Sequence, residues 1–489
     1  MSNKPSPWRN RLSFGIGTLG RDASAGLVSM YLMFYMTEVL NISTAATVSV
    51  ATIIMAMRIF DALNDPIMGL IVDNTKTRWG KFKPWIMLGA GLWAATTVTL
   101  FIDTGLTGGA FLIWFTIVYL IWSIAYTIND ISFYGMLPAL SRSQPEREKI
   151  GVVARICANV GLFATVVGVV PITKALGEQL GNPQHGWLVF AAILAAIMLF
   201  FQSFTLIFTK EQVTFRDEHT PLRELLSVIY RNDQLMWVTA AMLLFMGAYT
   251  TITMLGLHYF KYIYGDENMY PIFAAILGVT QLLALSVFPQ LTKVFSRRQI
   301  HTLASALCAA GLIVFWFGEV NMAVIAVAGL LLFSGQGFIQ LLMMMYIADC
   351  VEYGQWKLGR RNESITVALQ PFIYKASNGI ASGLMGIALV ISGISAFNDA
   401  GIPDSARVLT AAQITNFKLV MLVIPLLAVI VSWIILFTKY RISEDRYQEI
   451  IADLQLREAA TAPGESAGPG TAIPVTAQDT PTDNPDLKS

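Results

Sequence analysis

The stretch RIFDALNDP (residues 58–66) places two carboxylates in the middle of an apolar segment that extends from residue 45 to residue 72. Asp61 and Asp65 are four residues apart, so a helix would stack them on one face, one turn apart. Two like charges at this spacing disfavour each other's ionised form unless a cation lies near them. Because a charge at membrane depth is costly, the pair is the first candidate functional site.

The composition is that of a membrane protein with many spans. Of the 489 residues 55% are hydrophobic and 13% are charged, and the mean hydropathy is +0.58. Ordinary soluble domains carry about 25% charged residues. The net charge of +1 indicates no nucleic-acid partner. Three scattered cysteines predict neither a disulfide framework nor a metal site, and the long first apolar run predicts no cleaved signal peptide.

Twelve apolar segments divide the chain, and each is close to or longer than the roughly 20 residues that a helix needs to cross a membrane. They lie near residues 12–40, 45–72, 84–103, 109–139, 150–174, 187–209, 234–263, 269–290, 300–318, 322–350, 364–394 and 413–438. The sequence therefore predicts an all-α integral membrane protein with twelve transmembrane helices.

The connecting segments alternate between basic and non-basic. Lys and Arg gather before residue 12, in 76–83, 142–149, 210–231, 293–298 and 357–361, and after residue 438. The other connections hold only Lys174, Lys261 and Arg407 among their basic residues. By the positive-inside rule, this pattern predicts a multi-pass cell-membrane protein with both termini in the cytoplasm.

A polar stretch at residues 210–233 divides the spans into two sets of six. We expect an N-terminal six-helix bundle at 1–209, a central cytoplasmic loop at 210–233, and a C-terminal six-helix bundle at 234–440. Residues 441–489 are expected to form a largely disordered cytoplasmic tail, because 459–489 are rich in Ala, Thr, Pro, Gly and Asp. Two six-span halves describe a major facilitator fold.

The halves differ in the polar and charged residues that their spans carry. The first half holds Arg21, Asp22, Arg58, Asp61, Asn64, Asp65, Asn129, Asp130, Arg155 and Asn159, whereas the second holds chiefly Lys375. The few cations of the first half cannot neutralise all four aspartates, which must line a wet cavity or bind protons or a cation. Lys375 calls for a partner across the central cavity. Structural pairing remains an equal alternative for the arginines, as interhelical hydrogen bonding does for Asn64.

Two kinds of site fit these side chains. Clustered carboxylate and hydroxyl oxygens suit Na⁺ or a proton, and Thr127 lies on the same helical face as Asp130 and could add an oxygen. Asp22, Asp130 and Arg155 together offer acceptors and donors to the vicinal hydroxyls of a neutral polyol. Tyr134, one turn beyond Asp130, could lie against a sugar ring, although its position alone favours an interfacial aromatic belt.

The motifs DALNDPIMG (61–69) and RWGKFKPW (78–85) resemble the glycoside–pentoside–hexuronide:cation symporters, and within them the melibiose permeases. The resemblance continues in GRD (20–22), TINDI (127–131), ADCVEYG (348–354), RNES (361–364) and QPFIYK (370–375). It implies symport of a glycoside with Na⁺, Li⁺ or H⁺ by alternating access in a protein of the major facilitator fold. It implies no enzyme activity, no cofactor beyond the coupling cation, and a functional monomer.

The resemblance also implies roles for individual residues. It assigns the cation site, with Asp61 and Asp65 as the Na⁺ ligands, to Asp61, Asp65, Asn64 and Thr127. It assigns the sugar to Asp22, Asp130 and Arg155, with Arg21 and Tyr134 at positions where the melibiose type has Lys and Trp. Lys375 would couple the two sites, and Asp349, Glu352, Arg361 and Glu363 would form a cytoplasmic gate. Tyr134 and Pro371 depart from the melibiose type, so the particular sugar is open.

Three other functions are compatible with parts of the pattern. A lysophospholipid symporter would share the fold and the cation site, but the dense polar set of Asp22, Asp130 and Arg155 argues against an acyl-chain cleft. A passive sugar facilitator would need no paired carboxylates. A non-transporting sensor would need a cytoplasmic signalling domain, for which residues 440–489 are too short and irregular.

Overall fold

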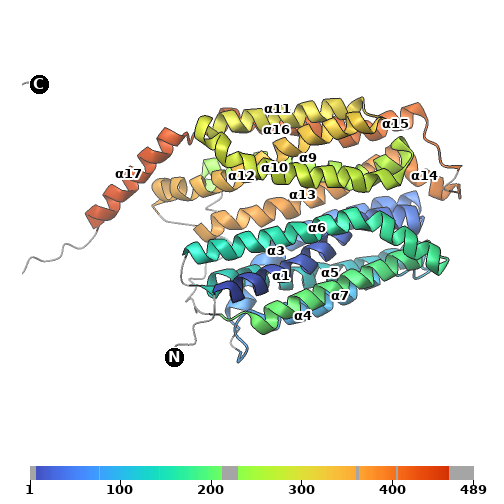
Figure 1. Cartoon of the computed structure of the whole chain (residues 1–489), viewed down its shortest axis with the longest axis horizontal. Coiled ribbons are helices and arrows are strands. Elements are labelled where there is room, and N and C mark those ends of the chain that lie inside the picture. Colours follow the sequence, from blue (N-terminus) through green and yellow to red (C-terminus); the bar gives the residue numbers. More distant parts are fainter. Residues whose placement is uncertain are drawn as a thin grey trace, which may run out of the picture.

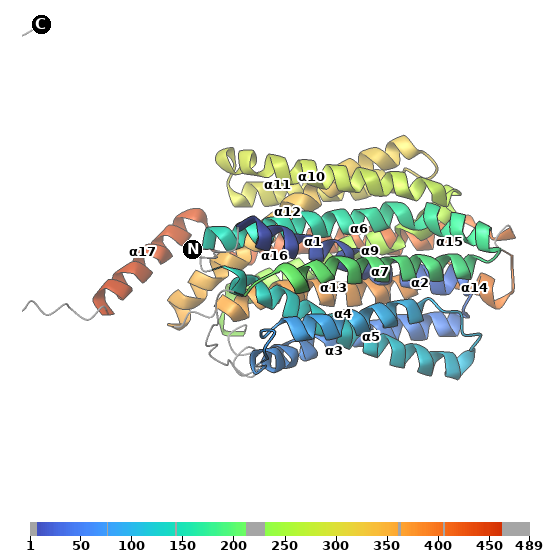
Figure 2. The same ribbon diagram turned by 60° about the horizontal axis from the view of Figure 1, so that its bottom comes forward.

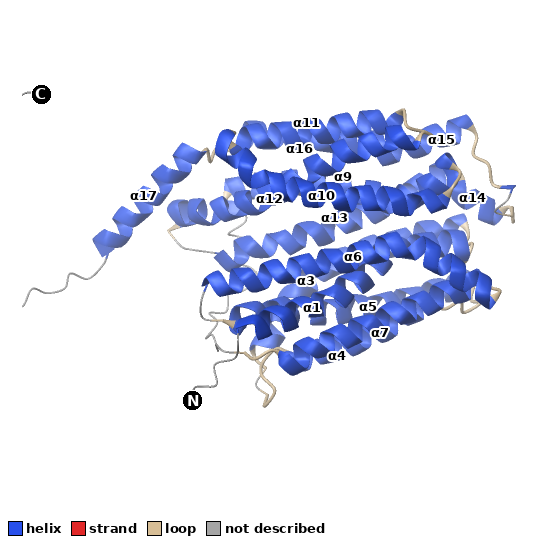
Figure 3. Cartoon of the chain, viewed as in Figure 1, coloured by secondary structure: helices blue, strands red, loops and turns tan. Residues whose placement is uncertain are grey.

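The computed structural model describes residues 7–75, 77–141, 144–211, 230–359, 363–403 and 406–461. Within these ranges every regular element is a helix, which confirms the all-α prediction (Figure 3). Eight of the described helices are long and apolar enough to cross a membrane. Three of the long helices outside that set, α1, α3 and α13, are those that carry Arg21, Asp65 and Lys375.

The first group of helices covers residues 7–208. It consists of α1 (Pro7–Gly26), η1 (Leu27–Tyr31), α2 (Leu32–Phe34), η2 (Tyr35–Val39), α3 (Thr44–Asp73), α4 (Lys83–Leu100), α5 (Gly108–Met136), η3 (Leu137–Leu140), α6 (Gln144–Leu180) and α7 (Pro183–Phe208). Local signals mark several ends: Asn182 caps α7 by accepting the Gln184 N–H at 2.8 Å. Proline follows at the first position of that helix, where its missing N–H costs nothing.

The second group covers residues 233–439, and a further helix follows it. The group consists of α9 (Asp233–Tyr259), η4 (Phe260–Tyr264), η5 (Glu267–Met269), α10 (Tyr270–Val294), α11 (Arg297–Trp316), α12 (Met322–Leu358), α13 (Glu363–Ile391), α14 (Ile394–Asp399), α15 (Ala411–Lys418), η7 (Leu419–Val423) and α16 (Ile424–Lys439). The helix that follows the group is α17 (Glu444–Thr461). Each predicted apolar segment overlaps one of the long helices or helical runs of the two groups, and several helices extend beyond the predicted segment, as α6 and α12 do. The region predicted as a tail begins with α17, which the sequence did not indicate.

The two groups lie side by side with their long helices aligned in one direction (Figures 1 and 2). Across the boundary α3 packs against α13, and α6 packs against α10. The start of α1 and the whole of α17 lie at one end of the molecule, here named the terminal end. The opposite end, which holds residues 38–44, 258–264 and 397–413, is named the distal end.

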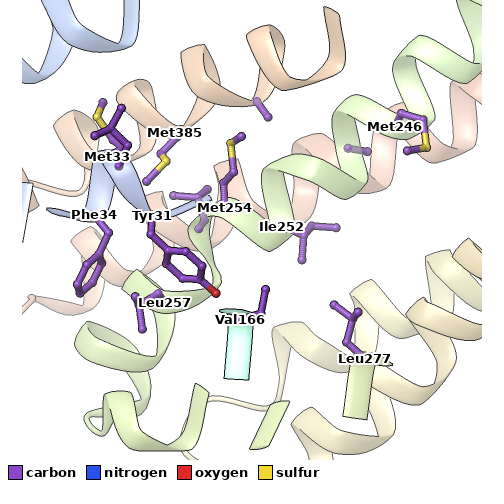
Figure 4. Close-up of a cluster of buried hydrophobic side chains, with 14 of the residues drawn as sticks. Tyr31, Met33, Phe34, Val166, Met246, Ile252, Met254, Leu257, Leu277 and Met385 are labelled. Atoms are coloured by element: carbon purple, nitrogen blue, oxygen red, sulfur yellow. The ribbon is translucent and has the colours of Figure 1, made fainter. Parts of the chain in front are cut away.

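An apolar layer joins the two groups on the distal side of the site described below. Figure 4 shows its side chains converging from several helices, among them Tyr31, Met33, Phe34, Val166, Met254, Leu257, Leu277 and Met385. The hydroxyls of Tyr31 and Tyr270 lie 3.0 Å apart within it. The halves are therefore closed against each other at this level by both burial of apolar surface and a polar contact.

Close packing of α1 against α7 determines the position of the motif Gly20-Arg21-Asp22. A Cβ on Gly20 would lie only 2.6 Å from the Cα of Met198, so glycine is what allows α1 to contact α7 here. The next two residues, Arg21 and Asp22, are consequently held at a constant depth in the first group.

Candidate functional site

Two helices of the first group present matching pairs of polar side chains. Asp61 and Asp65 lie one turn apart on α3, and Ser123 and Thr127 lie one turn apart on α5. The Ser123 hydroxyl donates to Asp61 Oδ1, and Thr127 Oγ1 donates to Asp65 Oδ1 at 3.2 Å. Both helices run from the distal to the terminal end. The two hydrogen bonds therefore join α3 and α5 at two levels, one helical turn apart. Carboxylate and hydroxyl oxygens thus converge as a monovalent cation requires.

Asp61 is neutralised within its own helix. Its side chain is 0% exposed, and Arg58 Nη1 lies 3.4 Å from its Oδ2. The Arg58 guanidinium also lies 5.7 Å from the centre of the Trp122 ring. Arg58 is therefore a buried structural partner of Asp61, which was one of the two alternatives that the sequence allowed.

Asp65 is neutralised by the other group of helices. Lys375 on α13 donates to both of its oxygens, at 2.5 and 2.6 Å. The Lys375 side chain is buried and lies 5.6 Å from the centre of the Tyr126 ring. Asp65 itself is half-buried, as is Asn64 beside it on α3. Within the described ranges, the ion pair between Asp65 and Lys375 thus connects the first group to the second at the depth of the site.

A second polar cluster adjoins these carboxylates. The Arg21 guanidinium on α1 donates to Asp130 Oδ1 on α5, and both side chains are buried. The same guanidinium lies 4.6 Å from the centre of the Tyr134 ring. Asp130 is close enough to Asp65 to interact with it electrostatically, so the two clusters form one continuous polar region.

Asp22, Arg155 and Tyr134 are the members of this region whose side chains keep exposed surface. Asp22 is half-buried, and its Oδ2, which is buried, has no hydrogen-bond partner although Arg21 and Arg155 act on it electrostatically. Arg155 is exposed and forms a side-chain hydrogen bond with Tyr374 of α13. Tyr134 is 40% exposed. Together these side chains offer acceptors, donors and a ring face of the kinds that suit a polyol.

Asn129, in contrast, has a structural role. Its side-chain amide and that of Gln202 exchange two hydrogen bonds of 2.9 Å each, and its Nδ2 also donates to the Ile86 carbonyl at 3.1 Å. All of its partners lie within the first group, so this residue joins α5 to α7 and α4 without facing a ligand.

The predicted gate residues lie on and after α12. Asp349 accepts a hydrogen bond from the Arg297 guanidinium and one of 2.9 Å from Tyr440 Oη, both within the second group. Glu352 is half-buried on α12. Arg361 lies outside the described residues, and Glu363 begins α13 with a side chain that is likewise outside the description. Their gating role stays a prediction.

The sequence did not predict a polar network at the distal end. Glu38 of the first group, with its side chain 1% exposed, accepts from Lys261 Nζ at 2.7 Å and from the Tyr262 hydroxyl. Arg407 Nη1 and His258 Nε2 each lie 3.6 Å from its oxygens. Four side chains of the second group thus surround one carboxylate of the first.

Two features were not predicted: the Ser123 hydroxyl beside Asp61, and the network around Glu38. The sequence holds a weak signal for each of them. Ser123 precedes Thr127 by four residues, which is the same spacing as that of Asp61 and Asp65. Lys261 and Arg407 are two of the three basic residues in the non-basic connections. Two cations placed where few are expected indicate a buried acidic partner, and Glu38 is that partner.

No multivalent metal centre is apparent in the part of the chain that the structure describes, since three or more His, Cys, Asp or Glu side chains nowhere converge as metal ligands. Two carboxylates and two hydroxyls form a different kind of donor set. That set suits a monovalent ion or a proton, which need fewer acidic ligands.

Comparisons with known proteins identify relatives along nearly the whole chain. The model of the family described as MFS/sugar transport protein matches residues 13–444. A lactose permease of Lactobacillus delbrueckii subsp. bulgaricus is 31% identical over 486 residues, covering 96% of this chain and 76% of the relative. A raffinose carrier protein of Pediococcus pentosaceus is 29% identical over 462 residues, covering 91% of this chain and 71% of the relative.

Solved structures share the fold. A bacterial homologue of the human lysosomal transporter Spinster, solved in an inward-facing and unoccupied conformation, superposes with a TM-score of 0.65 at 12% identity. The match covers 92% of this chain and 99% of that one. Together the matches confirm the predicted fold and the predicted family of sugar transporters. The relatives are permeases and carriers, so the prediction that the chain is not an enzyme is confirmed as well.

Proposed function

The chain belongs to the MFS/sugar transport protein family, and we propose that it carries a di- or oligosaccharide across the cell membrane together with a monovalent cation. The ion pair between Asp65 and Lys375 is the observation that carries the proposal. It joins the two groups of helices beside the accessible side chains of Asp22 and Arg155. A sugar and a cation bound at these neighbouring positions would act on the same contact between the halves.

We place the terminal end in the cytoplasm, with both chain termini there. Basic residues gather at that end, including Arg9, Arg297, Arg298 and Lys357. The connections on the distal side hold only Lys174, Lys261 and Arg407 among their basic residues. The contrast supports a cytoplasmic terminal end and an external distal end.

The coupling cation, Na⁺, Li⁺ or H⁺, binds at Asp61 and Asp65 with oxygens from Ser123, Thr127 and Asn64. Charge balance then determines what happens to Lys375. The two carboxylates are already neutralised by Arg58 and Lys375, so an added cation leaves one excess positive charge in a buried place. Cation binding therefore displaces the Lys375 ammonium from Asp65.

The displaced ammonium group couples the cation to the sugar. Released from Asp65, Lys375 can reach toward Asp130 and the sugar hydroxyls, whereas without the cation it is held by two hydrogen bonds. Asp22 and Arg155 accept from and donate to those hydroxyls, Arg21 holds Asp130 in place, and the Tyr134 ring lies against the sugar. Because linkage is reciprocal, bound sugar must tighten cation binding by the same factor.

Alternating access follows from breaking contacts between the two bundles. We assign residues 1–209 and 234–440 to the moving halves of a monomer, with the loop 210–233 between them. Opening the external side requires the network around Glu38 to separate. Closing the cytoplasmic side would engage Asp349, Glu352, Arg361 and Glu363, and Asp349 would then exchange its present partners, Arg297 and Tyr440, for others.

Accumulation in proteoliposomes tests the function. We expect uphill uptake of one or more of lactose, raffinose, melibiose and a panel of glucosides and xylosides, driven by a gradient of Na⁺, Li⁺ or H⁺. Uptake that only equilibrates under every gradient would indicate a passive facilitator. Asp103→Asn is a matched control, because it neutralises an exposed aspartate of a connecting segment far from the site.

A further inference from the structure

A cavity unrelated to the transport site lies at the terminal end of the second group. It has a volume of about 500 Å³ and lies between the start of α11 and the end of α16. Its lining includes Arg297, Arg298, His301, Tyr440, Arg441 and Glu444. We propose that this cavity binds an anion of the phosphate class, supplied either by a soluble phosphate or by the headgroup of a membrane lipid.

The N-terminus of the 20-residue helix α11 forms one wall. Ser296 and Gln299 form a capping box, which satisfies the N–H groups of Ser296 and Gln299. The Arg297 N–H instead donates to the carboxylate of Glu444 at 2.7 Å. Amide groups at a helix N-terminus favour negative charge. An anionic oxygen thus already occupies this position, and it comes from the first, exposed residue of α17.

His301 gives the cavity a buried polar side chain without a partner. Its side chain is 3% exposed, and neither Nδ1 nor Nε2 has a hydrogen-bond partner. Its ring packs edge-on against Tyr346, with the centroids 5.9 Å apart. A buried imidazole without partners is costly, and a ligand oxygen in the cavity would supply the absent acceptor.

The charges around the cavity favour a phosphate. Arg297, Arg298 and Arg441 line the cavity, as does the carboxylate of Glu444. Asp349 accepts a hydrogen bond from Arg297, so the three positive charges exceed the two negative ones. The Arg298 guanidinium donates to the Phe437 carbonyl at 2.8 Å and lies 3.9 Å from the centre of the Phe437 ring, so two contacts hold it on the cavity wall. Guanidinium groups suit phosphate oxygens because their N–H donors match them in pairs.

Either source of the phosphate is compatible with the position. Leu436 and Phe437 on the lining belong to the end of α16, a helix apolar enough to cross a membrane, so a headgroup in the adjacent leaflet would be within reach. Arg441 and Glu444 on the opposite side are exposed, and a soluble phosphate would enter there. In both cases the phosphate replaces the Glu444 carboxylate at the start of α11.

The test uses the full-length protein in micelles of a phosphate-free detergent and measures the unfolding midpoint. One arm adds inorganic phosphate to these micelles, with chloride at equal ionic strength as the reference. The other arm adds phosphatidylglycerol to the same micelles without inorganic phosphate. We expect a higher midpoint in at least one arm, and radiolabelled phosphate bound in equilibrium dialysis if the soluble source is correct.

Variants identify where the anion binds. Arg298→Gln and His301→Phe should each weaken the anion effect by about tenfold in concentration, whereas Arg457→Gln, which removes an arginine of α17 paired with Asp453, should not change it. If His301→Phe does not fold, Arg298→Gln decides alone. Absence of any effect of phosphate and phosphatidylglycerol, or an effect that persists unchanged in Arg298→Gln, would overturn the proposal.

Discussion

Two carboxylates of the first group of helices meet cations of the second group, but in very different surroundings. At the distal end Glu38 is almost fully buried and is surrounded by Lys261, Tyr262, Arg407 and His258. At the level of the transport site, Asp65 is half-buried and has one cationic partner, Lys375. The first arrangement holds the halves together with several partners at once, whereas the second depends on a single ammonium group.

The difference separates two tasks in a transporter. A carboxylate with one cationic partner can exchange it for a coupling ion without unpairing other groups. A carboxylate with several partners loses all of them only when the two halves part. We therefore interpret Asp65 as the point where the ion acts and Glu38 as the centre of an external latch. Four substitutions test this comparison, in order of decreasing effect.

Asp65→Asn should have the largest effect, because it removes the ion ligand and leaves the Lys375 ammonium buried without a counter-ion. Loss of one member of a buried ion pair costs about 3–5 kcal/mol. We expect cation-driven accumulation to fall by at least about a hundredfold, a factor equivalent to about 2.7 kcal/mol, while some sugar binding remains. The measurement is uphill uptake in proteoliposomes, with Asp103→Asn as control. Full retention of uphill uptake would contradict the assigned role.

Glu38→Gln should shift the conformational equilibrium toward the externally open state. A hydrogen bond to a charged group contributes about 1.5–3 kcal/mol, so the shift should be roughly ten- to a hundredfold. Labelling of a cysteine at position 254 reports it, because Met254 lies in the buried layer that opening would expose. Cys157 is first replaced by serine, since it is the half-buried one of the three native cysteines.

A matched control tests whether the effect belongs to the network around Glu38 or to the loss of any carboxylate at the distal end. Glu319→Gln removes the carboxylate that Lys418 contacts at 2.9 Å, and both of these residues lie in the second group. The labelling rate should therefore remain as in the unmodified protein. Equal acceleration by Glu319→Gln and Glu38→Gln would show that the network around Glu38 has no special role in holding the halves together.

Ser123→Ala should weaken cation binding by about tenfold. It removes the hydroxyl that donates to Asp61 and one oxygen of the proposed ion site. A hydrogen bond to a charged group contributes about 1.5–3 kcal/mol, and we expect the lower end because Asp61 keeps its contact with Arg58. Sugar affinity measured without the cation should not change, because Ser123 does not contact Asp22 or Arg155 directly. The measurement is the Na⁺ or Li⁺ concentration that gives half-maximal stimulation of sugar binding. Identical half-maximal concentrations would remove Ser123 from the site.

Tyr31→Phe should have the smallest effect. It deletes the hydrogen bond of 3.0 Å between the hydroxyls of Tyr31 and Tyr270 but keeps the apolar ring in the layer of Figure 4. A neutral hydrogen bond contributes about 0.5–1.5 kcal/mol, so labelling at position 254 should accelerate by at most about tenfold. An acceleration larger than that of Glu38→Gln would reverse the proposed order of the two contacts.

Much of the architecture could be predicted from the sequence because it depends on local pattern. Apolar length determines which segments can cross a membrane, and the spacing of Asp61 and Asp65 determines that they share a helical face. The same holds for Thr127 and Asp130 on α5. Motifs such as RWGKFKPW (78–85) were enough to indicate the family that the comparisons confirm.

The partners of the charged side chains were decided by the tertiary structure alone. Composition indicated that Lys375 needs an acidic partner, but not that Asp65 would be chosen over Asp61, which Arg58 already neutralises. Glu38 and Arg407 are separated by most of the chain and meet only because the two groups pack together at the distal end. Periodicity carries information over one or two turns of helix, whereas ion pairing between halves depends on how whole helices are placed, and only the packed structure contains that.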